Sequence, residues 1–150
     1  MIVALCVLLA GTIAWSVISR PPSAIKTLQT EIAAYRPGKF GSCFTGGGTN
    51  CVVDGDTFWM DGERIRVADI DAPETHPPRC DYEAQLGRRA TDRLRELLNG
   101  GPIELEAVDR DKDVYGRKLR IVIRNGESLG DRLVQEGLAR PWTGSRQPWC

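Results

Sequence analysis

Residues 51–74 read CVVDGDTFWMDGERIRVADIDAPE, and this stretch decides the fold. Aromatic and apolar residues dominate 57–60, and charged residues alternate with apolar ones along 63–68, as in a half-buried strand. The dipeptide Asp61-Gly62 between these segments is typical of a two-residue hairpin turn. With Val52-Val53 as a further strand, the stretch predicts three consecutive β-strands.

The next part of the chain predicts a long helix. After a loop with several prolines, Asp81 is placed to cap the helix, and Gly100-Gly101-Pro102 ends it. The expected apolar stripe recurs at helical spacing and consists of Tyr82, Leu86, Ala90, Leu94, Leu97 and Leu98.

Two more strands and a shorter helix complete the pattern. Apolar residues alternate with other residues along 103–107 and 119–123. Ser128 and Asp131 resemble a capping box for a helix that runs through Leu138. The order is three strands, a helix, two strands and a helix. We therefore expect a mainly β, α+β fold whose five strands suit a small closed barrel with two or three helices.

The first nineteen residues carry no charged side chain. The length of this run approaches the thickness of a bilayer core, so residues 1–19 are predicted to form an apolar helix that is a signal peptide or a membrane anchor. A buried core helix is the alternative. Arg20 follows the run, which by the positive-inside rule favours a cytoplasmic domain. We expect a linker with a short amphipathic helix at 20–42 and a folded domain at 43–150, with residues 41–50 as a loop.

The cysteines bear on the compartment. Cys6 lies in the apolar run, and four cysteines follow it. Cys43 and Cys51 are separated by a glycine-rich stretch that can fold back easily, so we favour this pair, and then Cys80–Cys150 by elimination. Four free thiols are the alternative. Because disulfides persist outside the cytoplasm, we expect a secreted or periplasmic protein, or one anchored with its domain outside the cytoplasm.

The composition excludes several classes of protein. Apolar residues make up 41% and charged residues 27% of the chain, a globular balance. Twenty basic and twenty acidic residues leave no net charge, which argues against a polycation that binds nucleic acid through bulk charge. The single histidine, His76, argues against a histidine-rich zinc site and a Ser-His-Asp triad.

Polar residues gather in three clusters, at 54–57, 69–75 and 109–117. Taken singly, the first is typical of a turn and the second of an acidic, solvated loop, although its three carboxylates could converge on a hard cation. The third begins like an EF-hand loop but fails because Val114 replaces the required glycine and Arg120 the required glutamate. Together with two arginines, the clusters suit a different chemistry.

Those arginines, Arg66 and Arg117, belong to segments that flank the expected barrel. Carboxylates can hold a divalent cation against a phosphate oxygen, and a further carboxylate can take a proton from water. Arginine matches phosphate oxygens two at a time and stabilises the charge of a five-coordinate transition state. The combination suits a site that hydrolyses phosphodiesters.

The motifs that carry this chemistry resemble the staphylococcal nuclease-like (thermonuclease) family over residues 50–141. They occur in the family's order, and they are Asp54-Gly55-Asp56-Thr57, Arg66-x4-Asp71-x-Pro73-Glu74, Asp113-x-Tyr115-Gly116-Arg117 and Glu136-Gly137-Leu138-Ala139. The resemblance implies an OB-fold barrel and a calcium-dependent nuclease that acts on DNA and RNA. It also implies cleavage of the P–O5′ bond, which leaves 3′-phosphates, and it implies no protein partner.

The resemblance further implies a metal site. Asp56 and Asp71 would bind the calcium ion, Ca²⁺, with the backbone carbonyl of Ala72. Asp54 would lie near the ion without binding it.

The resemblance implies roles for four more residues and leaves the role of a fifth, Trp142, open. Glu74 would be the general base, Arg66 and Arg117 would hold the scissile phosphate, and Tyr115 would contact the nucleotide. Trp142 lies outside the motifs, and its ring could stack on a base or simply pack against the protein.

Two other functions remain open from the sequence. One is a catalytically inactive nuclease-like module that binds nucleic acid or protein. The other is a calcium-binding protein of the cell envelope without hydrolytic activity. Digestion of DNA with calcium and with chelator separates the three.

Overall fold

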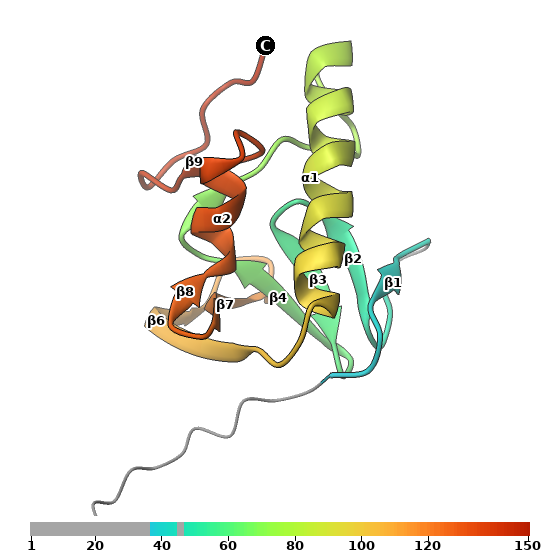
Figure 1. Ribbon diagram of the computed structural model, residues 1–150. Coiled ribbons are helices and arrows are strands. Elements are labelled where there is room, and N and C mark those ends of the chain that lie inside the picture. Colours follow the sequence, from blue (N-terminus) through green and yellow to red (C-terminus); the bar gives the residue numbers. More distant parts are fainter. Residues whose placement is uncertain (1–36, 45–46) are drawn as a thin grey trace, which may run out of the picture. The chain divides into compact units, whose positions relative to one another are not determined.

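The structure is a computed structural model that describes residues 37–44 and 47–150 (Figure 1). The predicted apolar helix of residues 1–19 and the helix of the 20–42 linker lie outside the described residues. Within the described residues, no helix combines the length and apolar character needed to cross a membrane.

Two helices, a mixed seven-stranded β-sheet and a separate two-stranded sheet make up the described part of the chain, which is an α+β fold. The elements in chain order are β1 (Gly41–Ser42), β2 (Cys51–Asp54), β3 (Thr57–Met60), β4 (Glu63–Val67), β5 (Ile70–Asp71), α1 (Asp81–Asn99), β6 (Glu104–Lys112), β7 (Lys118–Arg124), β8 (Glu127–Ser128), α2 (Leu129–Gln135) and β9 (Arg140–Pro141).

The three strands predicted from residues 51–74 are present as β2, β3 and β4, paired antiparallel in sequence order. The turn between β3 and β4 has Asp61 at φ 49° and Gly62 at φ 82°. These positive values are those of the hairpin turn that this dipeptide favours. One local prediction was wrong, because Gly41–Ser42 is a short strand parallel to β2 rather than loop.

The later strands complete the main sheet. β7 pairs parallel to β4 and antiparallel to β6, so the sheet order is β1-β2-β3-β4-β7-β6, with β8 on β7. The predicted strands at 103–107 and 119–123 correspond to β6 and β7, of which β6 extends five residues further, to Lys112. The parallel pairing of β4 with β7 brings the segment before β7 alongside Arg66 and Thr57.

Helix α1 contributes a large part of the core and lies beside β2 and α2 (Figure 1). Four residues of the predicted stripe are buried, and they are Leu86, Ala90, Leu94 and Leu98. Leu97 is partly buried against the core, but Tyr82 is 60% exposed, because it lies in the first turn, beyond the strands. The predicted cap was one residue late, since Cys80 holds the N-cap position and Asp81 begins the helix.

Helix α2 begins where the capping pattern predicted. The Ser128 side chain accepts a hydrogen bond from the backbone N–H of Asp131 at 3.1 Å. The helix ends at Gln135 and not at Leu138, because Gly137 adopts φ 68° and the Leu138 N–H bonds back to Leu133. This is the left-handed ending that glycine favours after a helix.

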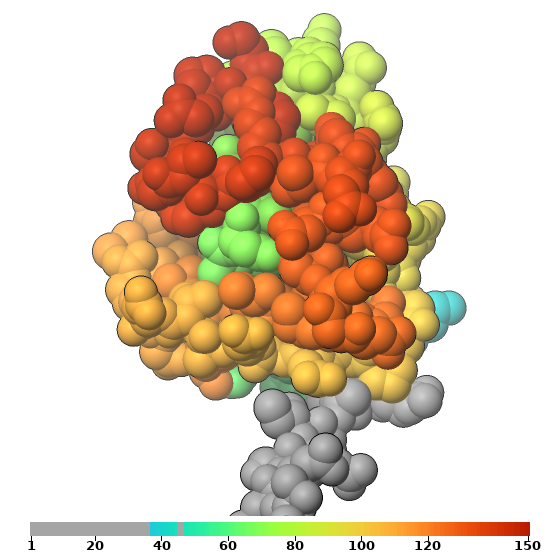
Figure 2. All heavy atoms as spheres, turned by 60° about the vertical axis from the view of Figure 1, so that its left-hand side comes forward, coloured from blue at the N-terminus to red at the C-terminus, as the bar shows by residue number. Residues whose placement is uncertain are grey.

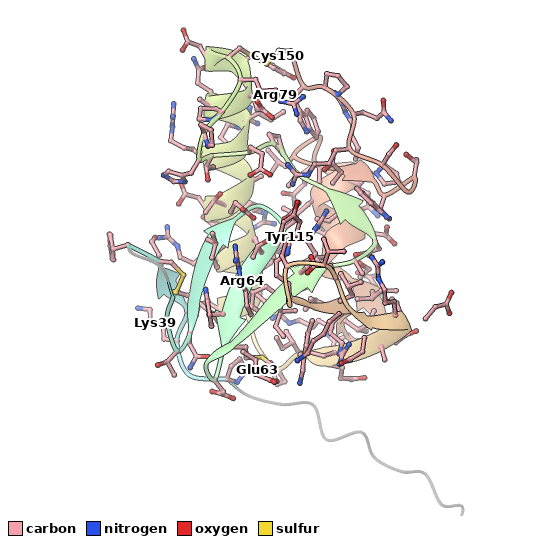
Figure 3. All side chains as sticks on the ribbon, turned by 180° about the vertical axis from the view of Figure 1, so that it is seen from behind. Lys39, Glu63, Arg64, Arg79, Tyr115 and Cys150 are labelled. Atoms are coloured by element: carbon pink, nitrogen blue, oxygen red, sulfur yellow. A yellow bond between two sulfur atoms is a disulfide. The ribbon has the colours of Figure 1, made fainter. Side chains whose placement is uncertain are left out.

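The C-terminal segment returns to the body of the domain. β9 pairs antiparallel with β5, with Asp71 opposite Arg140. Both disulfides that the sequence favoured are present, Cys43–Cys51 and Cys80–Cys150. The second joins the end of the chain to the start of α1, where Figure 3 shows Cys150 close to Arg79.

Candidate active site

The turn between β2 and β3 holds Asp56 in the interior, where the residue is 1% exposed. Its Oδ1 accepts a hydrogen bond from Thr57 Oγ1 at 2.9 Å, and its Oδ2 accepts one from the backbone N–H of Ala72 at 3.2 Å. Gly55 makes this close packing possible, because a Cβ there would lie 2.6 Å from the Ala90 Cβ and 2.8 Å from the Ala72 Cβ. The Asp-Gly-Asp-Thr motif therefore fixes one carboxylate against the segment that follows β5.

Arg66 on β4 lies next to that carboxylate. Its Nη1 is 3.1 Å from Asp56 Oδ2. The same guanidinium donates hydrogen bonds to the carbonyls of Val67 at 2.7 Å and Ile70 at 3.1 Å. Its Cζ lies 5.5 Å from the centre of the Trp142 ring. Arg66 is thus held in one orientation, buried between Asp56 and an aromatic ring of the C-terminal segment.

Asp71 ends β5 and is also buried, at 3% exposure. Burial raises the pKa of its carboxyl group, since the charged form loses hydration. Its Oδ1 is buried and accepts no hydrogen bond from any described residue. A buried acceptor without a hydrogen-bond donor is costly, and a cation near that oxygen offsets the cost; in this structure the Arg146 Nε lies 3.4 Å from it.

Glu74 lies three residues further along, half-buried. The loop that carries it is tied to α1 by Glu83, a residue for which the sequence analysis gave no role. The buried Glu83 carboxylate accepts the backbone N–H of Glu74 at 3.4 Å and that of Arg79 at 2.6 Å. Glu83 therefore keeps the Glu74 loop close to the helix.

Asp54 lies behind Asp56, whose backbone N–H donates to Asp54 Oδ1 at 3.2 Å. Desolvation, together with the nearby carboxylates of Asp56 and Glu74, raises the pKa of Asp54 to about 8. A raised pKa favours the protonated form of Asp54, and a proton there would lower the repulsion within the cluster.

Arg117 precedes β7 and reaches the same region from the other side. Its Nε donates to Asp113 Oδ2 at 2.6 Å, and its backbone N–H donates to Asp113 Oδ1 at 3.0 Å. Its Nη1 donates to Thr57 Oγ1 at 3.4 Å. The Cζ is 5.4 Å from the centre of the Tyr115 ring. Asp113, also not predicted as a site residue, thus orients Arg117 toward the neighbourhood of Asp56.

A pocket of about 520 Å³ lies beside the acidic residues without being lined by them, and its lining includes Arg66, Val114, Tyr115, Arg117, Trp142 and Arg146. Tyr115 is 77% exposed and Trp142 40% exposed, so both aromatic rings are accessible at its rim. In Figure 2 the red C-terminal segment and the orange β6–β7 region lie on either side of green atoms from the β4–β5 region. A neighbouring pocket of about 350 Å³ is bordered by Arg64, Glu74 and Tyr115, and Figure 3 shows Arg64 and Tyr115 on one face.

Arg146, in the C-terminal segment, joins the three acidic residues. Its Nε is 3.4 Å from Asp71 Oδ1, its Nη2 is 3.4 Å from Asp56 Oδ2, and its Nη1 bonds to Glu74 Oε1. No sequence pattern predicts a role for Arg146, because a single arginine among glycine, serine and proline residues gives no periodicity or motif.

The donor chemistry of Asp56 and Asp71 fits calcium, which prefers carboxylate and carbonyl oxygens. Among the described residues, no group of three or more His, Cys, Asp or Glu side chains is arranged to hold a metal ion. The three acids instead surround the Arg146 guanidinium. One expected neighbour lies elsewhere: Asp69 accepts a hydrogen bond from Ser128 Oγ at 2.6 Å, at the start of α2. Thus only two of the three aspartate and glutamate residues in 69–75 converge.

Comparison with known proteins agrees with this arrangement. A sequence model described as "Staphylococcal nuclease homologue" matches residues 64–148, more than half of the chain. The chain belongs to the staphylococcal nuclease family. Over 93 residues, or 59% of the chain, it is 34% identical to the thermonuclease of Staphylococcus hyicus and 38% identical to the endonuclease YncB of Bacillus subtilis (strain 168). Those matches cover 54% and 44% of the two relatives, so the chain spans about half of their length.

The family motifs and the geometry coincide at five residues. Asp56, Arg66, Asp71, Glu74 and Arg117 come from four separate segments of this staphylococcal nuclease homologue, and the structure brings them into one region. Tyr115 and Trp142 border the adjoining pocket.

Proposed function

We propose that the domain is a calcium-dependent nuclease that hydrolyses phosphodiester bonds in DNA and RNA. One observation carries the proposal: Asp56, Asp71 and Glu74 converge, and Arg66 and Arg117, which lie beside Asp56 and Thr57, line the adjoining pocket. Acids that can hold a divalent cation, next to arginines that can hold phosphate, form the minimum set for this reaction. The names of the relatives, thermonuclease and endonuclease, support the same reaction class.

Asp56 and Asp71, with the Ala72 carbonyl, would hold the calcium ion. The buried Oδ1 of Asp71 accepts no hydrogen bond among the described residues and instead has the Arg146 guanidinium 3.4 Å away, which supports a cation as the partner of this oxygen. The hydrogen bonds from Thr57 and Ala72 would keep the Asp56 carboxylate in a fixed orientation. When bound, the ion supplies positive charge at a phosphate oxygen and orients the substrate.

Glu74 would accept a proton from water while the water oxygen forms a bond to phosphorus. The P–O5′ bond breaks as that bond forms, the departing 5′ oxygen takes up a proton from solvent water, and the phosphate remains on the 3′ side. Glu74 is suited to this role because its carboxylate is half-buried, whereas Asp56 and Asp71 are almost completely buried. General-base assistance of this kind is worth about 10²–10⁴-fold in rate.

Arg66 and Arg117 would donate hydrogen bonds to the non-bridging phosphate oxygens. Both guanidinium groups are already oriented, Arg66 by Asp56 and two backbone carbonyls, and Arg117 by Asp113. Donors that are oriented in advance stabilise the charge that develops in the transition state without a further cost of reorganisation. Tyr115 and Trp142, exposed at the rim of the pocket, would contact the nucleotide by stacking.

Two further proposals concern the surroundings of the site. The strand order β2-β3-β4-β7-β6 supports a five-stranded OB-fold barrel. The two disulfides support a location outside the cytoplasm, either secreted, periplasmic or attached to a membrane through residues 1–19.

The test is digestion of end-labelled single-stranded DNA and of RNA, with calcium and with excess chelator. We expect cleavage only with calcium, and products whose mobility changes when phosphatase removes a 3′-phosphate. Full activity with chelator would contradict the metal assignment, and 3′-hydroxyl products would contradict the proposed bond. Binding of the oligonucleotide without cleavage would favour the inactive module.

A further inference from the structure

Arg146 is the most unusual feature of the site, because one guanidinium contacts three carboxylates from three places in the chain. Each of its nitrogens faces a different acid: Nε faces Asp71, Nη2 faces Asp56 and Nη1 faces Glu74. Asp56 and Asp71 are the residues proposed to bind calcium. A positive side chain of the protein therefore lies against the same oxygens that the cation would use.

The segment that carries Arg146 is held at both ends. On one side, β9 pairs with β5, and the backbone N–H of Trp142 donates to the Asp69 carbonyl at 2.8 Å. On the other side, the Cys80–Cys150 disulfide joins the end of the segment to the start of α1. Because both ends are fixed, Arg146 is present at the carboxylates at a high effective concentration.

A second contact stiffens the segment between those ends. The Arg140 guanidinium lies 3.7 Å from the centre of the Trp149 ring and donates to the Pro148 carbonyl at 3.0 Å. Trp149 packs against the hydrophobic core. Residues 143–148, including Arg146, are exposed, but the segment is anchored on both sides of them, by the pairing of β9 with β5 and by Trp149.

A guanidinium and a divalent cation cannot occupy the same carboxylate oxygens, and their charges repel at short distance. The acids are also spaced around the guanidinium, and within the described chain no three acidic, His or Cys side chains are arranged to hold an ion. Binding of a cation at Asp56 and Asp71 thus requires Arg146 to leave.

We propose that Arg146 is a built-in counter-ion that competes with the divalent cation for Asp56, Asp71 and Glu74, and that the disulfide-linked C-terminal segment sets the strength of this competition. The inference rests on the proposed calcium site. It predicts that the protein binds calcium more weakly than its carboxylates alone would, because part of the binding free energy displaces Arg146. It also predicts that Arg146 stabilises the fold while the cation is absent.

The experiment is isothermal calorimetry of calcium binding to the full chain without nucleic acid, together with thermal unfolding in chelator. Arg146→Gln keeps a polar side chain but removes the charge. Arg89→Gln, on the exposed face of α1, makes the same change of charge elsewhere and is the matched control. We expect Arg146→Gln to bind calcium about 5- to 100-fold more tightly than wild type and to have a lower Tm in chelator. Arg89→Gln should match wild type in both measurements.

A second variant tests the role of the segment. The double substitution Cys80→Ser/Cys150→Ser releases the end of the chain, and we expect a smaller increase in calcium affinity, in the same direction. Added to Arg146→Gln, it should give no further increase, because the competitor is already removed.

Each outcome decides the proposal. Equal calcium affinity of wild type and Arg146→Gln, with both binding one ion, would overturn the competition and leave the proposed nuclease site intact. Failure of both proteins to bind calcium would overturn the competition together with the proposed metal. A weaker affinity in Arg146→Gln would show that Arg146 assists binding, which also contradicts the proposal.

Discussion

The β-strand scaffold and the C-terminal segment, residues 142–150, contribute to the same site in different ways. Asp56 and Arg66 are positioned by the sheet itself, for example by the hydrogen bond from the Val67 N–H to the Asp56 carbonyl at 2.8 Å. The described residues of the C-terminal segment form no helix or strand, and a disulfide and an Arg–Trp contact hold them. Arg66 and Asp71 thus lie on strands, and Asp56, Glu74 and Arg117 lie in turns and loops that directly adjoin strands. Arg146, in contrast, comes from the C-terminal segment, whose end the Cys80–Cys150 disulfide holds.

The largest expected effect tests the scaffold side of this comparison. Glu74→Gln keeps the shape of the side chain and removes the base, so we expect the single-turnover rate on single-stranded DNA to fall about 10²–10⁴-fold. Calcium affinity should not fall, since Asp56 and Asp71 are the proposed ligands. Glu106→Gln, at an exposed position on β6, is the control and should cleave normally. A folded Glu74→Gln protein with near-normal turnover would remove Glu74 from the mechanism.

The next largest effect compares how much each disulfide, and so each of the two regions, contributes to the free energy of unfolding. Cys80–Cys150 closes a loop with a sequence separation of 70, whereas Cys43–Cys51 has a separation of 8. Because a longer closed loop restricts the unfolded chain more, we expect Cys80→Ser/Cys150→Ser to lower the free energy of unfolding by about 2–4 kcal/mol, and Cys43→Ser/Cys51→Ser to lower it by less. Urea denaturation of both variants measures the difference. The reverse order would mean that the C-terminal segment is held mainly by its non-covalent contacts.

The smallest effect concerns an ion pair outside the site, between α1 and the end of α2. Arg93 donates two hydrogen bonds of 2.8 Å to Glu136, and they hold the pKa of the Glu136 carboxyl below its ordinary value. A lowered pKa in the folded state stabilises the protein above the unfolded pKa, and this contribution is lost as the pH falls through the folded pKa. Both side chains are about a third exposed, so Glu136→Gln should cost only about 0.2–1 kcal/mol at pH 7. The difference from wild type should shrink as the pH falls below the unfolded pKa, about 4.3, and should disappear once the pH lies below the lowered pKa of the folded state. A difference that persists there would mean that packing of Glu136, not its charge, is responsible.

The sequence predicted the scaffold well because its signals are local. The alternation along 63–68 and the Asp61-Gly62 dipeptide specify β3, β4 and their turn within a few residues, and the structure contains them. The errors are also local. Cys80 takes the cap position in place of Asp81. Tyr82 faces solvent because it lies in the first turn of α1, beyond the sheet, and the periodicity of the sequence does not show where the helix extends past the sheet.

The residues that sequence reasoning missed depend on contacts distant in the chain. Arg146 donates to the carboxylate of Asp56, 90 residues away in the chain. The Glu83 carboxylate accepts a hydrogen bond from the backbone N–H of Glu74, at the other end of the loop before α1. The sequence position of Asp69 places it in the acidic cluster. In the structure its carboxylate instead accepts a hydrogen bond from Ser128, 59 residues away, at the start of α2. No periodicity or spacing within one segment specifies such pairs, so only the folded structure reveals them.

In the proposed mechanism, the buried carboxylates beside Arg66 bind calcium, and this binding is required for cleavage. The most direct measurement is calcium binding and DNA cleavage on the same preparation of Asp71→Asn, which keeps the shape of Asp71 and removes its charge. The exposed Asp131→Asn variant on α2 serves as control. We predict that Asp71→Asn loses calcium affinity and cleavage together, while Asp131→Asn keeps both. A folded Asp71→Asn protein that binds calcium and cleaves DNA like wild type would contradict the account.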